Sequence, residues 1–344
     1  MENSSPDHER HVFETPTTPS LKMVGNCYKP AAPEPEGLTI FLAHCIGAHK
    51  EQWEPIIHSL FVLQKDKPTK NRIREIWAFD WQSHGDSAVL NQEVLKKLSR
   101  SICEPLFLSY RASYMIAFDW THALTAFVQS PQMIGHRIVP IGHSAGAAAV
   151  LLTTRDIHRY PAIILIEPTI VAKDVFISRV DDRMAQMDFV VATTSNRRDS
   201  WTSRSQAYKY FVKRIPWGLW DPRIVRLLTD YGLEDLPSGT VGLKCQKTHE
   251  ASSYPDIEPH FEGARQLAKA CLKMPIHLIW GTRKELVPEF IQDSLAEGSG
   301  VASVAQIQDA GHFVVQEKPG ELAKALSDIL NTIRVDKFAD KSKL

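Results

Sequence analysis

Apolar residues in this chain gather in short, nearly continuous runs, separated by longer stretches in which polar and apolar positions mix. Six of these runs predict β-strands, because a parallel strand covered on both faces carries hydrophobic side chains throughout. The predicted strands cover residues 38–43, 73–79, 136–141, 162–166, 276–280 and 302–307, and helices are predicted at 110–129, 144–158 and 319–333. This alternation predicts an α/β fold with a doubly wound, mostly parallel sheet.

The alternation of strands and helices stops between residues 169 and 270, so this segment is predicted to be a helical cap insertion. The core is then assigned to residues 38–168 and 271–335. Residues 1–37 are assigned to an N-terminal extension with the first strands, and residues 336–344 to a C-terminal targeting tail. Residues 1–20 are rich in proline, serine, threonine and charge, so we expect them to be poorly ordered.

A G-x-S-x-G motif, Gly142 to Gly146, lies between the strand RIVPI and a helix rich in alanine. In this context the motif predicts a strained turn that lifts the hydroxyl of Ser144 out of the sheet at a helix N-terminus. The alternative is a glycine-rich turn with an incidental serine. Because of the strand and helix on either side, Ser144 is the candidate nucleophile.

A serine hydroxyl needs a base, and in chains with this motif the histidine comes late, after the acid. The segment DAGHF places His312 on a short glycine-containing loop between the last predicted strand and the last helix. From such a loop an imidazole can reach back to Ser144. The alternative is a surface histidine, because the chain has 14 histidines in all.

Four segments in their order and spacing resemble the α/β-hydrolase superfamily: AHCIGAH, DWQSHGDS, GHSAG and DAGHF. The resemblance covers residues 38–335 and implies the α/β-hydrolase fold. It also implies an oxyanion hole formed by the backbone N–H groups of Ile46 and Ala145. Cys45 stands where the superfamily usually has glycine; a Cys45 nucleophile is a rival idea, although no base pattern accompanies it.

The acid that would orient His312 is open between two residues. The resemblance places an aspartate on the loop after the strand 276–280, but this chain has Lys284 there, and Glu285 is one residue out of place. Glu167, at the end of the strand 162–166, is favoured over Glu285, because some members of the superfamily take the acid from that position. A carboxylate in either place would hold the histidine tautomer and stabilise the imidazolium.

The chain ends in Ser342, Lys343 and Leu344, the C-terminal signal that the peroxisomal import receptor reads. Together with the segment WGLWDPRIVRLLTDYGLE, this tail resembles fungal peroxisomal hydrolases of host-selective toxin biosynthesis, of the AK, AF and ACT type. The resemblance implies a peroxisomal location and a step in the formation of a secondary metabolite. A chance match at a charged helix end is the alternative for the tail.

Composition and charge narrow the choice of partners. Forty basic and forty acidic residues balance, so no electrostatic argument favours nucleic acid or an anionic membrane. No run of 18 apolar residues predicts a membrane span, and the N-terminus lacks the features of a secretory signal. The five widely spaced cysteines, without a CxxC pair, argue against a disulfide framework or a zinc site and favour a reducing compartment. No oligomeric state is predicted.

The predicted activity is hydrolysis of an ester or thioester of a hydrophobic acyl substrate, with no metal or organic cofactor. The cap is expected to form a lid whose tryptophans, Trp201, Trp217 and Trp220, either line the acyl pocket or pack as cap core. Two other functions remain open on the same fold: acyl transfer to another alcohol, and ligand binding without catalysis.

Overall fold

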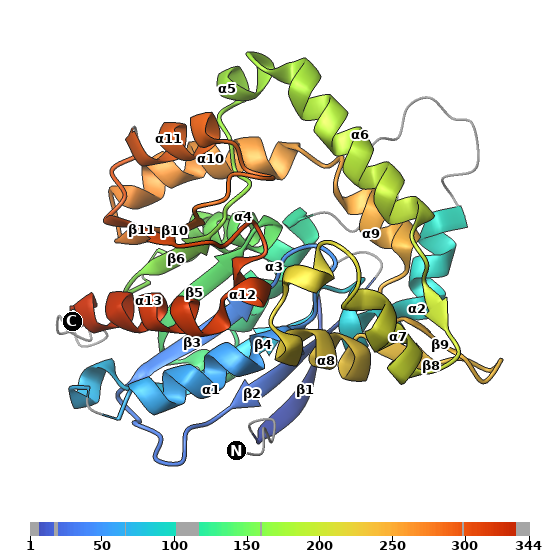
Figure 1. The fold of residues 1–344 in the computed structure, drawn as a ribbon. Helices are drawn as coiled ribbons and strands as arrows, with labels where there is room; N and C mark the ends of the chain where they lie inside the picture. Colours follow the sequence, from blue (N-terminus) through green and yellow to red (C-terminus); the bar gives the residue numbers. More distant parts are fainter. Residues whose placement is uncertain are drawn as a thin grey trace.

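An eight-stranded sheet forms the centre of the computed structural model, which describes residues 7–16, 20–65, 67–100, 117–158, 160–297 and 299–334 (Figure 1). The strand order is β1-β2-β4-β3-β5-β6-β10-β11. The first two strands are antiparallel to their neighbours, and the other six run parallel. The strands are β1 (His8–Glu14), β2 (Lys22–Tyr28), β3 (Leu38–Ala43), β4 (Ile73–Phe79), β5 (Arg137–His143), β6 (Ile163–Ile166), β10 (Ile276–Gly281) and β11 (Ser303–Ile307).

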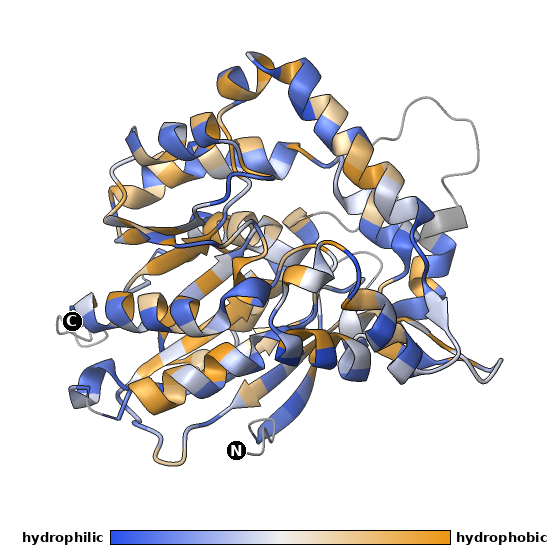
Figure 2. Ribbon diagram, viewed as in Figure 1, coloured by the Kyte–Doolittle hydropathy of each residue, from blue (hydrophilic) through white to orange (hydrophobic). Residues whose placement is uncertain are grey.

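The central strands are hydrophobic throughout because successive side chains enter two different cores. In β3, for example, Ile40 and Leu42 belong to one buried cluster, whereas Phe41 and Ala43 belong to the cluster on the opposite face. Figure 2 shows the central strands as mainly hydrophobic, whereas helices such as α13 alternate hydrophobic and hydrophilic bands. The six strands predicted from apolar runs are all present, with ends shifted by at most two residues.

Helices cover both faces of the sheet, as the doubly wound prediction requires. On one face α1 packs against α13, and on the other α4 packs against α3 and α10. Each helix contributes apolar side chains to the cluster on its own face. The core helices are α1 (Glu54–Leu63), α2 (Gly85–Arg100), α3 (Ala117–Val128), α4 (Ala145–Leu152), α10 (Glu258–Cys271), α11 (Glu289–Glu297), α12 (Val314–Glu317) and α13 (Pro319–Thr332).

The order of the strands reverses between β3 and β5, which are neighbours in the sheet. The next strand in the chain after β3, β4, lies on one side of this pair, and β6, which follows β5, lies on the other. In open α/β sheets the crevice at the carboxyl ends of such a pair is where ligands bind. The loop 44–48 follows β3 and Ser144 follows β5, so both lie at this crevice.

The segment after β6 forms a cap of helices and a small antiparallel sheet of order β7-β9-β8. Helix α6 runs along the edge of the molecule away from the central sheet, from α5 to α9 (Figure 1). The cap elements are α5 (Lys173–Ile177), α6 (Val180–Asn196), β7 (Ser200–Trp201), α7 (Arg204–Phe211), α8 (Pro222–Tyr231), β8 (Leu233–Asp235), β9 (Val241–Leu243) and α9 (Lys247–Ser253).

Two sequence expectations about the limits of these regions differ from the structure. Residues 8–14 are not poorly ordered but form β1, which pairs with β2 along its whole length. The ring of Phe13 also packs against Phe127 with centroids 5.3 Å apart. Helix α10, which the sequence analysis placed in the insertion, lies against α4, and its residues Phe261 and Leu267 belong to the main core.

Several predictions fall on residues outside the described part of the chain. These include the C-terminal tripeptide Ser342–Lys343–Leu344, residues 110–116 of the predicted helix, and Cys103. The four other cysteines are free: Cys27, Cys45, Cys245 and Cys271. Within the described ranges, no helix is both long and apolar enough to cross a membrane.

Candidate active site

The turn between β5 and α4 holds Ser144 in a strained backbone conformation, with φ of 58° and ψ of −121°. Only glycine adopts a positive φ without cost, so the surrounding structure must hold this turn. The glycines on either side are needed for space. A Cβ atom at Gly142 would lie 2.3 Å from the carbonyl oxygen of Gly146, and one at Gly146 would lie 2.6 Å from the carbonyl oxygen of Ala43. The turn predicted from G-x-S-x-G is therefore present.

A chain of hydrogen bonds joins Ser144, His312 and Glu167. The Nε2 atom of His312 lies 2.9 Å from the Oγ atom of Ser144, and its Nδ1 atom lies 3.2 Å from Oε2 of Glu167. An ionised carboxylate only accepts hydrogen bonds, so Nδ1 carries the hydrogen and Nε2 is free to accept the serine proton. All three side chains are buried. The arrangement can thus move a proton from the hydroxyl to the imidazole.

The carboxylate of Glu167 is fixed by contacts at both oxygens. Its Oε1 atom accepts a 2.6 Å hydrogen bond from the N–H group of Gly281, while Oε2 faces His312. The backbone of Glu167 has a positive φ of 45°, and its N–H donates to the carbonyl oxygen of Ile279. These contacts at the end of β6 aim the side chain across the carboxyl edge of the sheet toward the imidazole.

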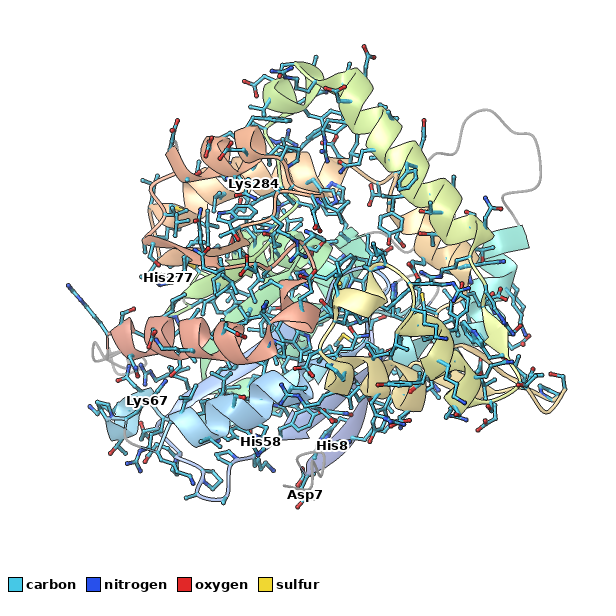
Figure 3. All side chains as sticks on the ribbon, viewed as in Figure 1. Asp7, His8, His58, Lys67, His277 and Lys284 are labelled. Atoms are coloured by element: carbon cyan, nitrogen blue, oxygen red, sulfur yellow. The ribbon has the colours of Figure 1, made fainter. Side chains whose placement is uncertain are left out.

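The other acid considered from the sequence, Glu285, is engaged elsewhere. Its carboxylate pairs with the guanidinium of Arg283 at 2.8 Å, and its side chain is 47% exposed. Lys284, at the position where the resemblance places an aspartate, lies on the loop between β10 and α11 and pairs with Glu289 at 2.7 Å (Figure 3). The structure therefore brings Glu167, and not Glu285, to His312.

The loop after β3 is held in place by two buried histidines. His84 Nε2 accepts a 3.0 Å hydrogen bond from the N–H of Gly47, and His44 Nε2 accepts one of 3.2 Å from the N–H of Trp81. Burial lowers the pKa of His44 to about 3 and that of His84 well below its usual value, so both are neutral acceptors. Gly47 has a φ of 80°, which suits glycine.

Cys45, the rival nucleophile, lies in the same loop, but its thiol is not activated. Burial raises the pKa of its thiol to about 12, so the reactive thiolate is scarce at neutral pH. Its Sγ atom lies 3.8 Å from the side-chain amide of Gln316. The thiol of Cys45 is therefore a buried group that packs against the side chain of Gln316.

A cavity of about 140 Å³ opens beside Ser144 and His312, under helix α6 of the cap. Ile46 and Ala145, the two predicted oxyanion donors, both line it. Ala145 is the first residue of α4, where backbone N–H groups have no partner within the helix. The walls are mainly apolar and include Val171, Phe176, Met187, Val190, Leu286 and Ile291.

The tryptophans of the insertion do not line this cavity. Trp201 and Trp220 are buried in a separate hydrophobic cluster formed by the cap elements, and Trp217 packs against it. The sequence left open whether these tryptophans line the acyl pocket or pack as cap core. The structure shows that they pack as cap core. The apolar wall facing Ser144 comes instead from α5, α6 and α11 and from loops of the core.

Comparison with known families adds to this geometry. The sequence pattern of the alpha/beta hydrolase family matches residues 40–325. The chain belongs to the alpha/beta hydrolase family. The match spans β3 to α13 and so contains the Ser144 turn, Glu167 and the His312 loop. A comparison with curated proteins finds no significant match in sequence.

Solved structures similar to this alpha/beta hydrolase include a peroxisomal alpha-beta-hydrolase from Saccharomyces cerevisiae, with TM-score 0.73 and 16% identity over 96% of this chain and 91% of that one. A thioesterase domain from the curacin biosynthetic pathway has TM-score 0.65 and 14% identity over 95% of this chain and 100% of that domain. A thermophilic esterase from Thermogutta terrifontis has TM-score 0.58 and 14% identity over 94% of this chain and 99% of the esterase. Identities this low show the fold alone, so the predicted α/β-hydrolase fold is confirmed.

One residue of this alpha/beta hydrolase that the sequence analysis passed over is His143, beside the serine in the motif. Its Nε2 atom lies 2.8 Å from the backbone carbonyl oxygen of His312. Burial lowers the pKa of His143 to about 3, so the ring is neutral and donates through Nε2 to that carbonyl. His143 thereby positions the loop that carries His312. The only sequence signal for this role is that His143 occupies the variable position before the serine in the G-x-S-x-G motif.

The cap of this alpha/beta hydrolase is tied to the core close to the site. The carboxylate of Glu250 makes a two-pronged ion pair with Arg197, and a Cβ atom at Gly47 would lie only 2.8 Å from Oε1 of Glu250. The ring of Trp220 packs against Phe313, with centroids 5.7 Å apart. The cap therefore contacts both the loop after β3 and the loop of His312.

Among the described residues, no group of three His, Cys, Asp or Glu could hold a metal ion.

Proposed function

We propose that this protein is a serine hydrolase that cleaves an ester or thioester of an acyl substrate. The observation that carries the proposal is the hydrogen-bond chain from Ser144 through His312 to Glu167 at the wall of a largely apolar cavity. A serine becomes nucleophilic when a base takes its proton, and the base needs an acid to fix its tautomer. The three side chains meet both needs.

In the proposed reaction, Ser144 Oγ attacks the acyl carbonyl carbon while His312 Nε2 takes the hydroxyl proton. The negative charge on the carbonyl oxygen is stabilised by the backbone N–H groups of Ile46 and Ala145, a contribution of about 10²–10³ in turnover per donor. His312 then gives its proton to the leaving alcohol or thiol. Water, activated by the same imidazole, releases the acid and restores Ser144.

The cavity favours a small acyl group or the first part of a longer one. Its volume of about 140 Å³ is close to that of engineered cavities of ~150 Å³ that hold a benzene molecule. Its mainly apolar walls suit a hydrocarbon chain. The esterase and thioesterase among the structural neighbours are consistent with this class of substrate.

A fluorophosphonate probe tests the proposal directly, because such probes react only with an activated serine. We expect labelling of the intact protein, with the adduct mapped to Ser144 by peptide mass spectrometry. The Ser144→Ala variant should not be labelled. A wild-type protein that stays unlabelled, while a known serine esterase in the same assay reacts, would instead favour ligand binding without catalysis.

We further propose that the protein acts in peroxisomes, in the biosynthesis of a fungal toxin or related secondary metabolite. The support for the location is the C-terminal Ser342–Lys343–Leu344 and the likeness to a hydrolase described as peroxisomal. The support for the pathway is the resemblance of residues 217–234 to the toxin-associated hydrolases. The import receptor is then the protein partner.

Deleting Leu344 tests the location, because the receptor reads the tripeptide only at the end of the chain. With a fluorescent protein fused to the N-terminus, the full chain should collect in peroxisomes and the shortened chain should spread through the cytosol. A fluorescent protein that carries only residues 335–344 should collect in peroxisomes too. Peroxisomal signal from the shortened chain would contradict this assignment.

A further inference from the structure

One charged side chain in the cavity has no counter-charge among the residues that the structure describes. Arg183, on helix α6, lines the same cavity as Ser144 and His312, on the side formed by the cap. Its Nε atom is buried and has no hydrogen-bond partner among the described residues. Removing a polar N–H group from water without a partner is costly, and more so when the group is charged.

The helix itself offers no acid to Arg183. Its neighbours one turn away are Arg179, Val180, Gln186 and Met187, so none of the positions that face it along α6 carries a carboxylate. Gln186 uses its side-chain amide to donate to the backbone carbonyl of Glu285. The helix thus presents a cation into the cavity without local compensation.

Three of the acids around the cavity are engaged with partners other than Arg183. Glu285 pairs with Arg283, and Glu250 pairs with Arg197. Glu167 accepts from His312 and from a backbone N–H. In the described part of the chain, no acid forms an ion pair with Arg183.

Arg183 and Arg197, the half-buried arginines on either end of the cap segment 183–197, differ in whether they have a counter-charge. Burial alone would lower the pKa of Arg197, yet the carboxylate of Glu250 raises it above its usual value. Burial lowers the pKa of Arg183, and no charged group offsets this effect. A negatively charged group bound in the cavity would offset the desolvation of the Arg183 guanidinium, as the carboxylate of Glu250 does for Arg197.

We propose that Arg183 binds a carboxylate on the acyl substrate, so that the substrate is a half-ester or half-thioester of a short dicarboxylic acid. The proposal rests on the proposed function and names its substrate class. A guanidinium presents a flat pair of N–H donors that matches a carboxylate. The scissile carbonyl lies at Ser144 on the sheet side, the free carboxylate lies at α6, and the hydrocarbon between them contacts the apolar walls.

A pair of substrates of similar size tests this recognition. Monophenyl adipate carries a free carboxylate, whereas phenyl heptanoate ends in a hydrocarbon, and both release phenol. We expect wild-type kcat/KM to be about 10- to 100-fold higher for the adipate, which corresponds to one buried charge-assisted hydrogen-bonded pair. In Arg183→Gln this ratio should fall to about one. Because both esters are measured on the same preparation, a loss of folded protein cancels in the ratio.

Arg179→Gln is the matched control, because it removes the same charge from the residue just before the same helix. The Arg179 guanidinium lies 6.0 Å from the centre of the Phe290 ring and does not line the cavity. We expect this variant to keep the wild-type preference. Arg183→Lys should retain part of the preference, since the ammonium keeps the charge but loses the flat pair of donors.

Titration of adipate by calorimetry separates this proposal from the hydrolase proposal. Adipate should bind wild-type protein and Arg179→Gln but bind Arg183→Gln at least tenfold more weakly. A wild-type ratio near one, or equal adipate binding by both arginine variants, would overturn the role of Arg183 and leave hydrolysis intact. Adipate binding that depends on Arg183 in a protein that cleaves neither ester would overturn hydrolysis alone.

Discussion

Replacing Ser144 by alanine should lower the turnover of an acyl ester by about 10⁴- to 10⁶-fold. This is the loss expected when the nucleophile of a serine, histidine and acid unit is removed, because the remaining members then contribute little by themselves. Here the hydroxyl is 2.9 Å from the base, and among the residues that the structure describes no second serine or thiol contacts His312 in its place. The measurement is kcat with a phenyl ester, from initial rates and after subtraction of spontaneous hydrolysis.

The fold of the Ser144→Ala variant should be unchanged. Alanine keeps the Cβ atom, so the strained turn with its φ of 58° is neither relieved nor worsened. Thermal unfolding should therefore occur near the wild-type temperature. Ser294→Ala, which removes a hydroxyl from α11 that bonds only to a carbonyl of its own helix, should keep wild-type turnover. A Ser144→Ala protein that is folded and retains more than a few per cent of activity would contradict the mechanism.

Replacing Glu167 by glutamine should lower kcat by about 10⁴-fold, the loss seen when an amide replaces the acid in such a unit. In this protein Gly281 donates its N–H to one oxygen of Glu167, so the amide oxygen of glutamine will take that position. The NH₂ group then faces Nδ1 of His312 and forces that nitrogen to accept. The hydrogen moves to Nε2, which can no longer take the proton of Ser144.

Glu285→Gln is the matched comparison for this prediction. It makes the same chemical change on a side chain that is 47% exposed and paired with Arg283. We expect its kcat to stay within about twofold of wild type, because exposed ion pairs contribute little to the structure. Equal losses in the two variants, or a loss confined to Glu285→Gln, would refute the assignment of Glu167 as the orienting acid.

The serine turn and the histidine loop were accessible from sequence because their signals are local. Gly142 is required by contacts within the turn and Gly146 by the close approach of Ala43 at the end of β3, but both glycines stand beside the serine in the chain, so a short motif records the geometry. The strands were accessible because both faces of the sheet are covered, which leaves continuous apolar runs. β1 gave no such run: it is an edge strand whose side chains alternate between exposed and half-buried, so its sequence, HERHVFE, is largely polar.

Sequence alone determined the doubly wound fold, the serine turn and the late histidine, since each depends on the spacing of residues that are neighbours in the chain. Tertiary structure alone brought Glu167 rather than Glu285 to His312, gave His143 its contact with the His312 carbonyl, and left Arg183 without a counter-charge among the described residues. These features depend on which segments meet across the carboxyl edge of the sheet and beneath the cap. The physical reason is that hydrogen bonds and ion pairs are set by distances of about 3 Å between side chains, which the order of residues along a chain does not record.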